Sequence, residues 1–332
     1  MVGQPKPKPK PKPKPITVTN TKTNIKMPNL NPGFQPFAGL YEPSAIQQLP
    51  DGRFLLVEDE QKHSFSLVTL GAGGVSEHKS LEPGWFQSGD PFWKLDDLEG
   101  LALDSQGYLY AVTSHSRNDG GEQKKARDKL VRFRIDGDRV VKPVVVDGLK
   151  PALVAAHPLL AAAAEIQDVK ALGGLNVEAL EITPDRQSLL LGFRSPLQGA
   201  LAVIATVENP EAVFEAGAEP VIGGTLQLLD LGGQGIRGMA YVASLAGYLI
   251  ISGPTSREKD DFKLWFWKGQ ANAPARRVTV TGLQGLERAE GVSPAVIDGV
   301  QRIVIVSDDG DRTKGRFARF LLLEPEQLQI EP

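Results

Sequence analysis

The sequence predicts an all-β protein folded as a single β-propeller of five blades, with six blades as the alternative. The first supporting observation is a phrase that occurs five times, in which one charged residue stands just before a short apolar strand; the charged residues are Glu42, Glu99, Glu178, Arg237 and Glu290. The second observation is that a partner strand follows each phrase and ends in polar residues. The spacing of the phrases lies just above the roughly 40–50 residues typical of propeller repeats.

Composition bounds the class of protein. The chain has 332 residues, of which 41% are hydrophobic, and a net charge of −3, so it can bury a full core and shows no charge bias toward nucleic acid. No apolar run is long enough for a membrane span and no secretory signal is visible, so we expect a cytoplasmic protein. The absence of cysteine excludes thiolate catalysis and cysteine-ligated metals.

Residues 1–33 are predicted to be an extended arm and linker outside the propeller, which would span residues 34–332. Lysine and proline alternate from Pro5 to Pro15, and proline fixes φ and removes amide donors. We expect a solvated spacer or tail. The alternative is an arm that contacts an acidic partner or surface.

The strands of each blade can be placed from alternating and β-branched residues between turn signals. They are expected at residues 45–49, 53–57, 65–70 and 75–80; 100–103, 108–113, 129–135 and 140–146; 178–182, 188–193 and 200–207; 238–241, 248–252, 262–267 and 276–281; and, in a fifth blade, up to 317–323. A strand from the N-terminal region could complete the fifth blade and close the ring.

One long interval interrupts the repeat, between Glu99 and Glu178. Residues 151–165 are rich in alanine and predict a helical surface insertion, with Pro158 starting or kinking a helix. A sixth blade would require residues 213–231 to form one.

Several phrases together carry a family resemblance: residues 97–102, 114–117, 192–197, 235–238, 289–291 and 307–310. On these phrases the chain resembles an uncharacterised bacterial family of unknown function, common in cyanobacteria, whose members look like distant relatives of phytase-like esterase propellers. The resemblance implies hydrolysis of a phosphoester or ester aided by calcium. The chain shows the acidic strand starts of those relatives and not a complete set of their catalytic residues.

The strand pattern also predicts a functional face. In an antiparallel pair, the start of the first strand and the end of the second lie at the same edge. The five charged residues should therefore ring the mouth of the central channel, on the same face as Glu58, Asp59, His115, Arg117, Arg194, Asp308 and Asp309.

Carboxylates gathered in such a ring must bind a cation, pair with arginine or take up a proton. The first hypothesis is a Ca²⁺ or Mg²⁺ site whose oxygens come from Glu99, Glu178, Glu290, Asp308 and Asp309. Such a metal could polarise an ester. In this hypothesis the anion is held by Arg117, Arg194 and Arg237, and His115, Arg194 and Arg237 are the catalytic residues.

Two alternatives remain open at this point. In the first, the carboxylates pair with Arg117, Arg194 and Arg237 and lock blade to blade, so that the ring is structural. In the second, the propeller is a non-catalytic scaffold that binds an anionic small molecule or a protein partner. Trp265 and Trp267 lie on one side of a predicted strand, where packing is expected and a carbohydrate platform is the alternative.

Overall fold

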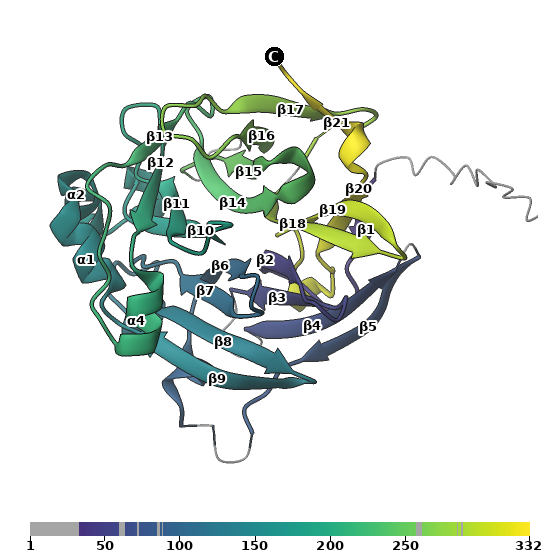
Figure 1. The fold of residues 1–332 in the computed structure, drawn as a ribbon, viewed down its shortest axis with the longest axis horizontal. Coiled ribbons are helices and arrows are strands. Elements are labelled where there is room, and N and C mark those ends of the chain that lie inside the picture. Colours follow the sequence, from purple (N-terminus) through teal and green to yellow (C-terminus); the bar gives the residue numbers. More distant parts are fainter. Residues whose placement is uncertain are drawn as a thin grey trace, which may run out of the picture. The chain divides into compact units, whose positions relative to one another are not determined.

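The computed structural model describes residues 33–332 except 60–63, 72, 85–86, 88, 257–260, 284 and 287. The predicted arm therefore lies outside the described residues. Five antiparallel sheets surround a central axis, and their first strands, β2, β6, β10, β14 and β18, lie nearest to it (Figure 1). The predicted five-bladed propeller is confirmed.

Each blade runs outward from its first strand, and we name the blades A to E in chain order. Blade A has β2 (Pro43–Gln48), β3 (Phe54–Glu58), β4 (Phe65–Gly71) and β5 (Gly74–Ser80), and blade B has β6 (Leu98–Leu103), β7 (Leu109–Thr113), β8 (Leu130–Asp136) and β9 (Arg139–Val146). Blade C has β10 (Asn176–Ile182), β11 (Leu189–Ser195), β12 (Ala202–Val207) and β13 (Gln227–Leu229).

Each of the last two blades includes a short strand from one end of the domain. Blade D has β14 (Gly235–Val242), β15 (Gly247–Gly253), β16 (Lys263–Trp267), β17 (Arg276–Val280) and β21 (Leu328–Ile330). Blade E has β18 (Ala289–Ile297), β19 (Val300–Ser307), β20 (Arg319–Leu323) and β1 (Gln35–Pro36). Because β1 pairs with β20, a strand from the start of the domain closes the ring, as the sequence predicted.

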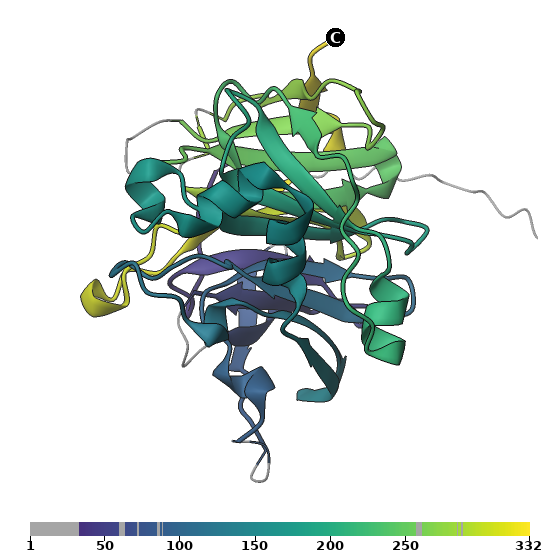
Figure 2. The ribbon, with the colours of Figure 1, turned by 90° about the vertical axis from the view of Figure 1, so that its left-hand side faces the viewer.

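Helices are few and lie outside the ring of blades (Figure 2). The insertion between blades B and C holds α1 (Leu149–Ala156), α2 (Pro158–Glu165) and α3 (Val169–Leu172), with Pro158 at the first turn of α2 where no amide donor is needed. The remaining helices are α4 (Pro210–Ala216) and the short 3₁₀ turns η1 (Pro91–Lys94), η2 (Lys125–Arg127), η3 (Ala243–Leu245), η4 (Arg312–Lys314) and η5 (Pro325–Gln327).

The alternative of a sixth blade is wrong. Residues 213–231 fall in α4 and in β13, the outer strand of blade C. The apolar residues that suggested a blade instead fill the core layer between blades B and C: Val213 and Phe214 are buried in the same cluster as Leu189 and Val203 of blade C, and Phe214 contacts Tyr110 of blade B.

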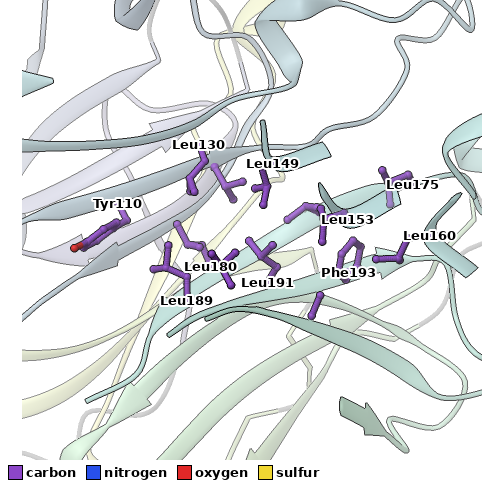
Figure 3. Packing of buried hydrophobic residues seen from close by; sticks show 14 of the residues in the cluster. Tyr110, Leu130, Leu149, Leu153, Leu160, Leu175, Leu180, Leu189, Leu191 and Phe193 are labelled. Atoms are coloured by element: carbon purple, nitrogen blue, oxygen red, sulfur yellow. The ribbon is translucent and has the colours of Figure 1, made fainter. Parts of the chain in front are cut away.

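The core consists of apolar layers between neighbouring blades. In the layer between blades B and C, Leu149 and Leu153 of α1 and Leu160 of α2 pack on Leu180 and Phe193 of blade C (Figure 3). The insertion is thus more than a surface excursion, because its apolar side fills the space where two blades diverge. Burying a side chain of this size contributes roughly 1.5–3 kcal/mol.

A β-bulge interrupts the first strand of every blade near its start. The extra residues are Ser44, Glu99, Glu178, Arg237 and Glu290. A bulge re-aims its side chain out of the normal alternation. The residue after each bulge is glycine or alanine, because a neighbouring first strand comes very close: a Cβ on Gly100 would lie 2.7 Å from the Leu180 amide nitrogen.

Candidate functional site

The five bulge residues form the channel mouth, which corrects one position of the predicted ring. In blade A the residue at the bulge is Ser44, two positions after Glu42. The sequence suggested Glu42 because it is the charged residue nearest to the strand, whereas the bulge position in this blade is uncharged. Glu42 still lines the same cavity from the loop before β2.

A polar cavity of about 200 Å³ opens at this end of the channel. Its walls combine the first strands of all five blades with two loops, residues 116–119 and 167–170, the second of which belongs to the insertion. The lining residues are Glu42, Ser44, Asp59, Asp97, Glu99, Ser116, Arg117, Asn118, Asp119, Arg127, Gln167, Asp168, Val169, Lys170, Asn176, Glu178, Arg194, Arg237, Glu290 and Asp308. The insertion therefore helps to build the cavity.

One side of the cavity is held by ion pairs, and we call Glu178, Arg194, Arg237 and Glu290 the paired half. Arg237 Nε lies 2.8 Å from Glu178 Oε2, and its Nη2 pairs with Glu290. Arg194 Nη1 lies 3.2 Å from Glu178 Oε1 and so supplies a second cation to the same carboxylate. These contacts join blades C, D and E, because each partner comes from a different first strand or its neighbour.

The opposite side is richer in carboxylates, and we call Glu42, Asp59, Asp97 and Glu99 the acidic half. Asp97 is well anchored: Arg127 Nη1 lies 2.9 Å from its Oδ2, and the Ser116 hydroxyl donates to the same oxygen at 3.2 Å. Asp59 forms a hydrogen bond with Asp97, which requires a proton between the two carboxyl groups. Among the described residues, the side chains of Glu42 and Glu99 have no hydrogen-bond or ion-pair partner.

The crowding of carboxylates raises several pKa values. Burial, reinforced by the nearby charges of Glu178, Asp97, Asp59 and Glu290, raises the pKa of Glu99 well above its usual value. Burial and the hydrogen bond with Asp97 raise the pKa of Asp59 to about 8. Burial raises the pKa of Glu290 to about 8 although Arg237 opposes the shift, and it raises the pKa of Asp308 to about 6. The cavity thus holds more carboxyl groups than its basic side chains can pair with, and protons offset part of the excess.

The structure brings together most of the predicted site residues. Those that line the cavity are Glu99, Glu178, Glu290, Asp308, Arg117, Arg194 and Arg237. Asp309 does not line it and instead pairs with Arg319, while Ser307 donates to its other oxygen at 2.6 Å. Arg117 faces the cavity but donates to the Ala164 and Gly121 carbonyls, at 3.2 Å each.

His115, predicted to move a proton, does not line the cavity. Its side chain is fully buried, and burial, with Lys150 and Lys129 adding to the effect, lowers its pKa to about 3. Neither ring nitrogen has a hydrogen-bond partner in the part of the chain that the structure describes. His115 does follow the end of β7, as predicted, but its backbone is left-handed, with φ of 55°, and changes the direction of the chain there. We place His115 outside the site.

Three contributors to the cavity were not predicted as site residues, although two of them stand two positions before a bulge residue. They are Asp97, Arg127 and Asn176. Asp97 adopts φ of 62°, which aspartate tolerates better than most side chains, and its position two residues before a bulge charge was the available clue. Arg127 comes from a loop 30 residues further along, and only the fold brings it here.

The predicted metal ligands fit a hard cation in type but not in placement. Carboxylate oxygens are the ligands that Ca²⁺ and Mg²⁺ prefer. Of Glu99, Glu178 and Glu290, however, the last two already hold Arg237 between them. Within the described ranges, no three Asp, Glu or His side chains are grouped closely enough to hold a metal ion as they stand.

Comparison with known proteins gives one family match. Residues 167–317 match the family described as "Protein of unknown function (DUF3616)". The match runs from the insertion into blade E, and with it the expected resemblance to a family of unknown function is confirmed over this segment. No curated protein matches the chain. The resemblance to phytase-like propellers stays a prediction.

Solved structures similar to this one are distant. The PQQ-bound aldose sugar dehydrogenase of Streptomyces coelicolor is 18% identical over 90% of this chain and 98% of its own, with a TM-score of 0.40. A gluconolactonase of Xanthomonas campestris is 12% identical over 88% and 83%, with a TM-score of 0.37. The allergen Mala s 1 of Malassezia sympodialis is 11% identical over 86% and 80%, with a TM-score of 0.43. Such values carry no argument about function.

None of the helices in the described ranges is both long and apolar enough to span a membrane. The cytoplasmic location stays a prediction.

Proposed function

We propose that this propeller binds a small, positively charged ligand in the cavity at its channel mouth. The observation that carries the proposal is the pairing of the lining charges. Nine of the lining residues are Asp or Glu and five are Arg or Lys. Each of the five basic side chains already lies within 4.0 Å of a carboxylate. Charge left over on the walls is therefore negative, which favours a cation over an anion.

The acidic half is where such a ligand would bind. Glu99 projects from a bulge in the first strand of blade B and lacks a partner among the described residues. Asp59 and Asp97 lie close enough to Glu99 to raise its pKa. A cation placed against these three carboxylates would remove their mutual repulsion, so that part of the cost of holding them together would be recovered on binding.

Asn176 adds a requirement for a hydrogen-bond donor. Its side-chain nitrogen donates to Glu178 Oε1 at 2.8 Å, and this fixes the orientation of the amide, because the reverse orientation would place two oxygens in contact. The Asn176 Oδ1 atom is then buried without a donor in the described part of the chain. An ammonium or guanidinium group, or the water shell of a divalent cation, could supply that donor.

Hydrolysis of a phosphoester or ester, aided by a divalent cation, is the second candidate. Glu42 and Glu99 have no arginine partner among the described residues, but a hard cation would have to draw them and Asp59 closer together than they lie in this structure. If a cation were held there, it would supply a Lewis acid for the ester oxygen. Asp59, with a pKa raised to about 8, is the lining group best suited to exchange a proton near neutral pH, in place of His115.

The proposal can be tested by thermal unfolding and calorimetry with CaCl₂, MgCl₂ and putrescine. We expect at least one of them to raise the Tm, because the folded protein alone presents the gathered carboxylates; a ligand at 100 times its Kd contributes about 2.7 kcal/mol. The Glu99→Gln variant should lose this response.

A matched control is Glu122→Gln, since Glu122 is an exposed glutamate that pairs with Lys124 and does not line the cavity. If none of the three probes shifts the Tm, or if both variants lose the response equally, the proposal is wrong. Hydrolysis is tested separately with p-nitrophenyl phosphate and p-nitrophenyl acetate, with and without Ca²⁺. Activity that survives in Asp59→Asn would exclude the second candidate but not cation binding.

A further inference from the structure

A second hollow lies at the outer margin of blade D, far along the sheet from the channel-mouth strands. It is a groove of about 570 Å³, lined by Gly232, Lys263, Trp265, Pro274, Ala275, Arg276, Arg277, Glu331 and Pro332. None of these residues lines the channel-mouth cavity. The groove is therefore a separate place on the molecule.

The strand register explains why these side chains meet. Trp265 of β16 is directly paired with Arg277 of β17, so both side chains lie on the same face of blade D. Lys263, two residues before Trp265, shares that face. Trp265 packs at the edge of the core layer shared with blade C, which also includes Trp267, Leu229 and Leu231. Blade C ends in the three-residue strand β13, whereas blade D continues through β17 to β21, and the groove lies where the longer blade extends outward.

The charge of the groove is opposite to that of the channel mouth. Lys263, Arg276, Arg277 and one acidic residue, Glu331, line the groove. Arg276 is paired with Phe266 and its guanidinium carbon lies 5.2 Å from that ring, on the other face of the sheet, so Lys263 and Arg277 supply the positive charge. Among the described residues none of the three basic side chains forms an ion pair. The Arg277 Nη1 atom is buried without a hydrogen-bond acceptor in the described ranges, and burial lowers the pKa of this guanidinium. A buried donor of this kind is costly unless an acceptor reaches it.

The aromatic wall is rigid. The Trp265 indole nitrogen donates to the Ser252 hydroxyl at 2.8 Å, and this hydroxyl donates to Gln234 Oε1 at 2.6 Å. The Arg277 guanidinium carbon lies 5.5 Å from the centre of the Trp265 ring. A fixed indole next to an unsatisfied guanidinium suits a ligand that has a flat ring and an anionic group a short distance apart.

We propose that the groove at the outer margin of blade D binds an anionic ligand with a flat ring, whose phosphate or carboxylate contacts Arg277 and Lys263 and whose ring packs against Trp265. The volume of the groove is in the range of pockets that hold small organic ligands, roughly 300–1,000 Å³. The proposal does not depend on cation binding at the channel mouth.

The experiment is calorimetric titration of the full chain with adenosine 5′-monophosphate, benzoate and adenosine. We expect the monophosphate or benzoate to bind, and adenosine, which keeps the ring and lacks the anion, to bind at least about tenfold more weakly. Tighter binding of the monophosphate would identify a phosphate ligand, and tighter binding of benzoate a carboxylate ligand. If neither anion binds, the proposal is overturned.

The Arg277→Gln variant should weaken anion binding by at least about tenfold. Arg134→Gln is the matched control, because Arg134 also lies over an aromatic ring, 4.0 Å from the centre of Tyr108, but on blade B. Equal weakening in both variants would show diffuse attraction to positive charge and would overturn the proposal. Should Arg277→Gln fail to fold, Lys263→Gln carries the same expectation, since Lys263 lies at the same face and has no ion-pair partner among the described residues.

Discussion

The two halves of the channel mouth start from the same local structure and end with different chemistry. Glu99 in the acidic half and Glu178 in the paired half are both bulge residues of a first strand, both followed by a small residue. Glu178 is 2% exposed and holds two arginines, whereas Glu99 holds none in the described structure. The comparison shows that the bulge only orients a side chain toward the channel. Whether that side chain stabilises the fold or can bind a ligand depends on whether a basic side chain from a neighbouring strand pairs with it.

The largest effect should follow from removing the cation of the paired half. In the Arg237→Gln variant, Glu178 loses one of its two cations and Glu290 loses its ion-pair partner among the described residues, and both carboxylates are almost fully buried. Breaking a buried pair in this way costs about 3–5 kcal/mol. We expect a loss of that order in the free energy of unfolding, measured with urea.

Arg194→Gln is the comparison variant, because Glu178 keeps Arg237 when Arg194 is lost. Arg194→Gln should lower the free energy of unfolding clearly less than Arg237→Gln does. If Arg237→Gln cost less than about 1 kcal/mol, the paired half would not be the structural side of the mouth.

The second effect concerns the close approach that follows each bulge. A Cβ on Gly238 would lie 1.9 Å from the carbonyl oxygen of Glu290, which is backbone and cannot rotate away. Gly238→Ala should therefore destabilise the protein by about 1–3 kcal/mol, as over-packing does. Gly224→Ala is the control, since its added methyl group would meet nothing within 4 Å. Equal thermal unfolding of the two variants would contradict the close approach.

The repeat made the fold predictable for a physical reason. A charged residue followed by Gly or Ala indicates a β-bulge at which the first strands of two neighbouring blades lie close together. Because every blade packs on the next, this pair of residue types recurs around the ring. Glu99, Glu178, Arg237 and Glu290 were found in this way. Ser44 was not predicted, because serine is uncharged and the pattern relied on charged residues. The nearby Glu42 was predicted in its place.

The rest of the site depends on pairing between distant segments. That Arg237 would lie between Glu178 and Glu290, and not face a ligand, is decided by the order of the blades around the ring and the reach of one side chain. His115 is buried and adopts a left-handed backbone, with φ of 55°, and its sequence position indicates neither feature. The part of the cavity wall at residues 167–170 comes from an insertion with no counterpart in the repeat.

A third, smaller effect tests the acidic half directly. Glu99→Gln keeps the shape of the side chain and removes a carboxyl group whose ionisation is opposed by burial and by neighbouring carboxylates, which raise its pKa. In buffer without added cations we expect the variant to be slightly more stable than the wild type, with a Tm higher by about 2 °C. Differential scanning calorimetry can resolve this change. A Tm lowered by several degrees would instead place Glu99 among the structural carboxylates, and the distinction between the two halves would fail.

The smallest effect is a dependence of stability on pH that follows from Asp59. Its pKa is raised to about 8, so the folded protein keeps a proton on this carboxyl that the unfolded chain has released near pH 4. Stability from this group is therefore present at low pH and is lost as the pH rises toward 8. Below pH 6.5, His115 acts in the opposite direction, because its pKa is lowered to about 3 and the unfolded chain gains a proton there. Between pH 6.5 and 8, therefore, His115 does not contribute to the change in stability and the effect of Asp59 can be measured.

In that window the Tm of the wild type should fall as the pH rises, and Glu181 and Glu290, each with a pKa raised to about 8, should add to the fall. Asp59→Asn should fall less steeply, because one of the contributing protons is gone. Asp185→Asn serves as the control: a hydrogen bond from Thr183 lowers the pKa of Asp185, so this group is ionised in both states throughout the window. If Asp59→Asn and the wild type gave parallel Tm curves, Asp59 would not hold a proton in the folded state, and its hydrogen bond with Asp97 would be contradicted.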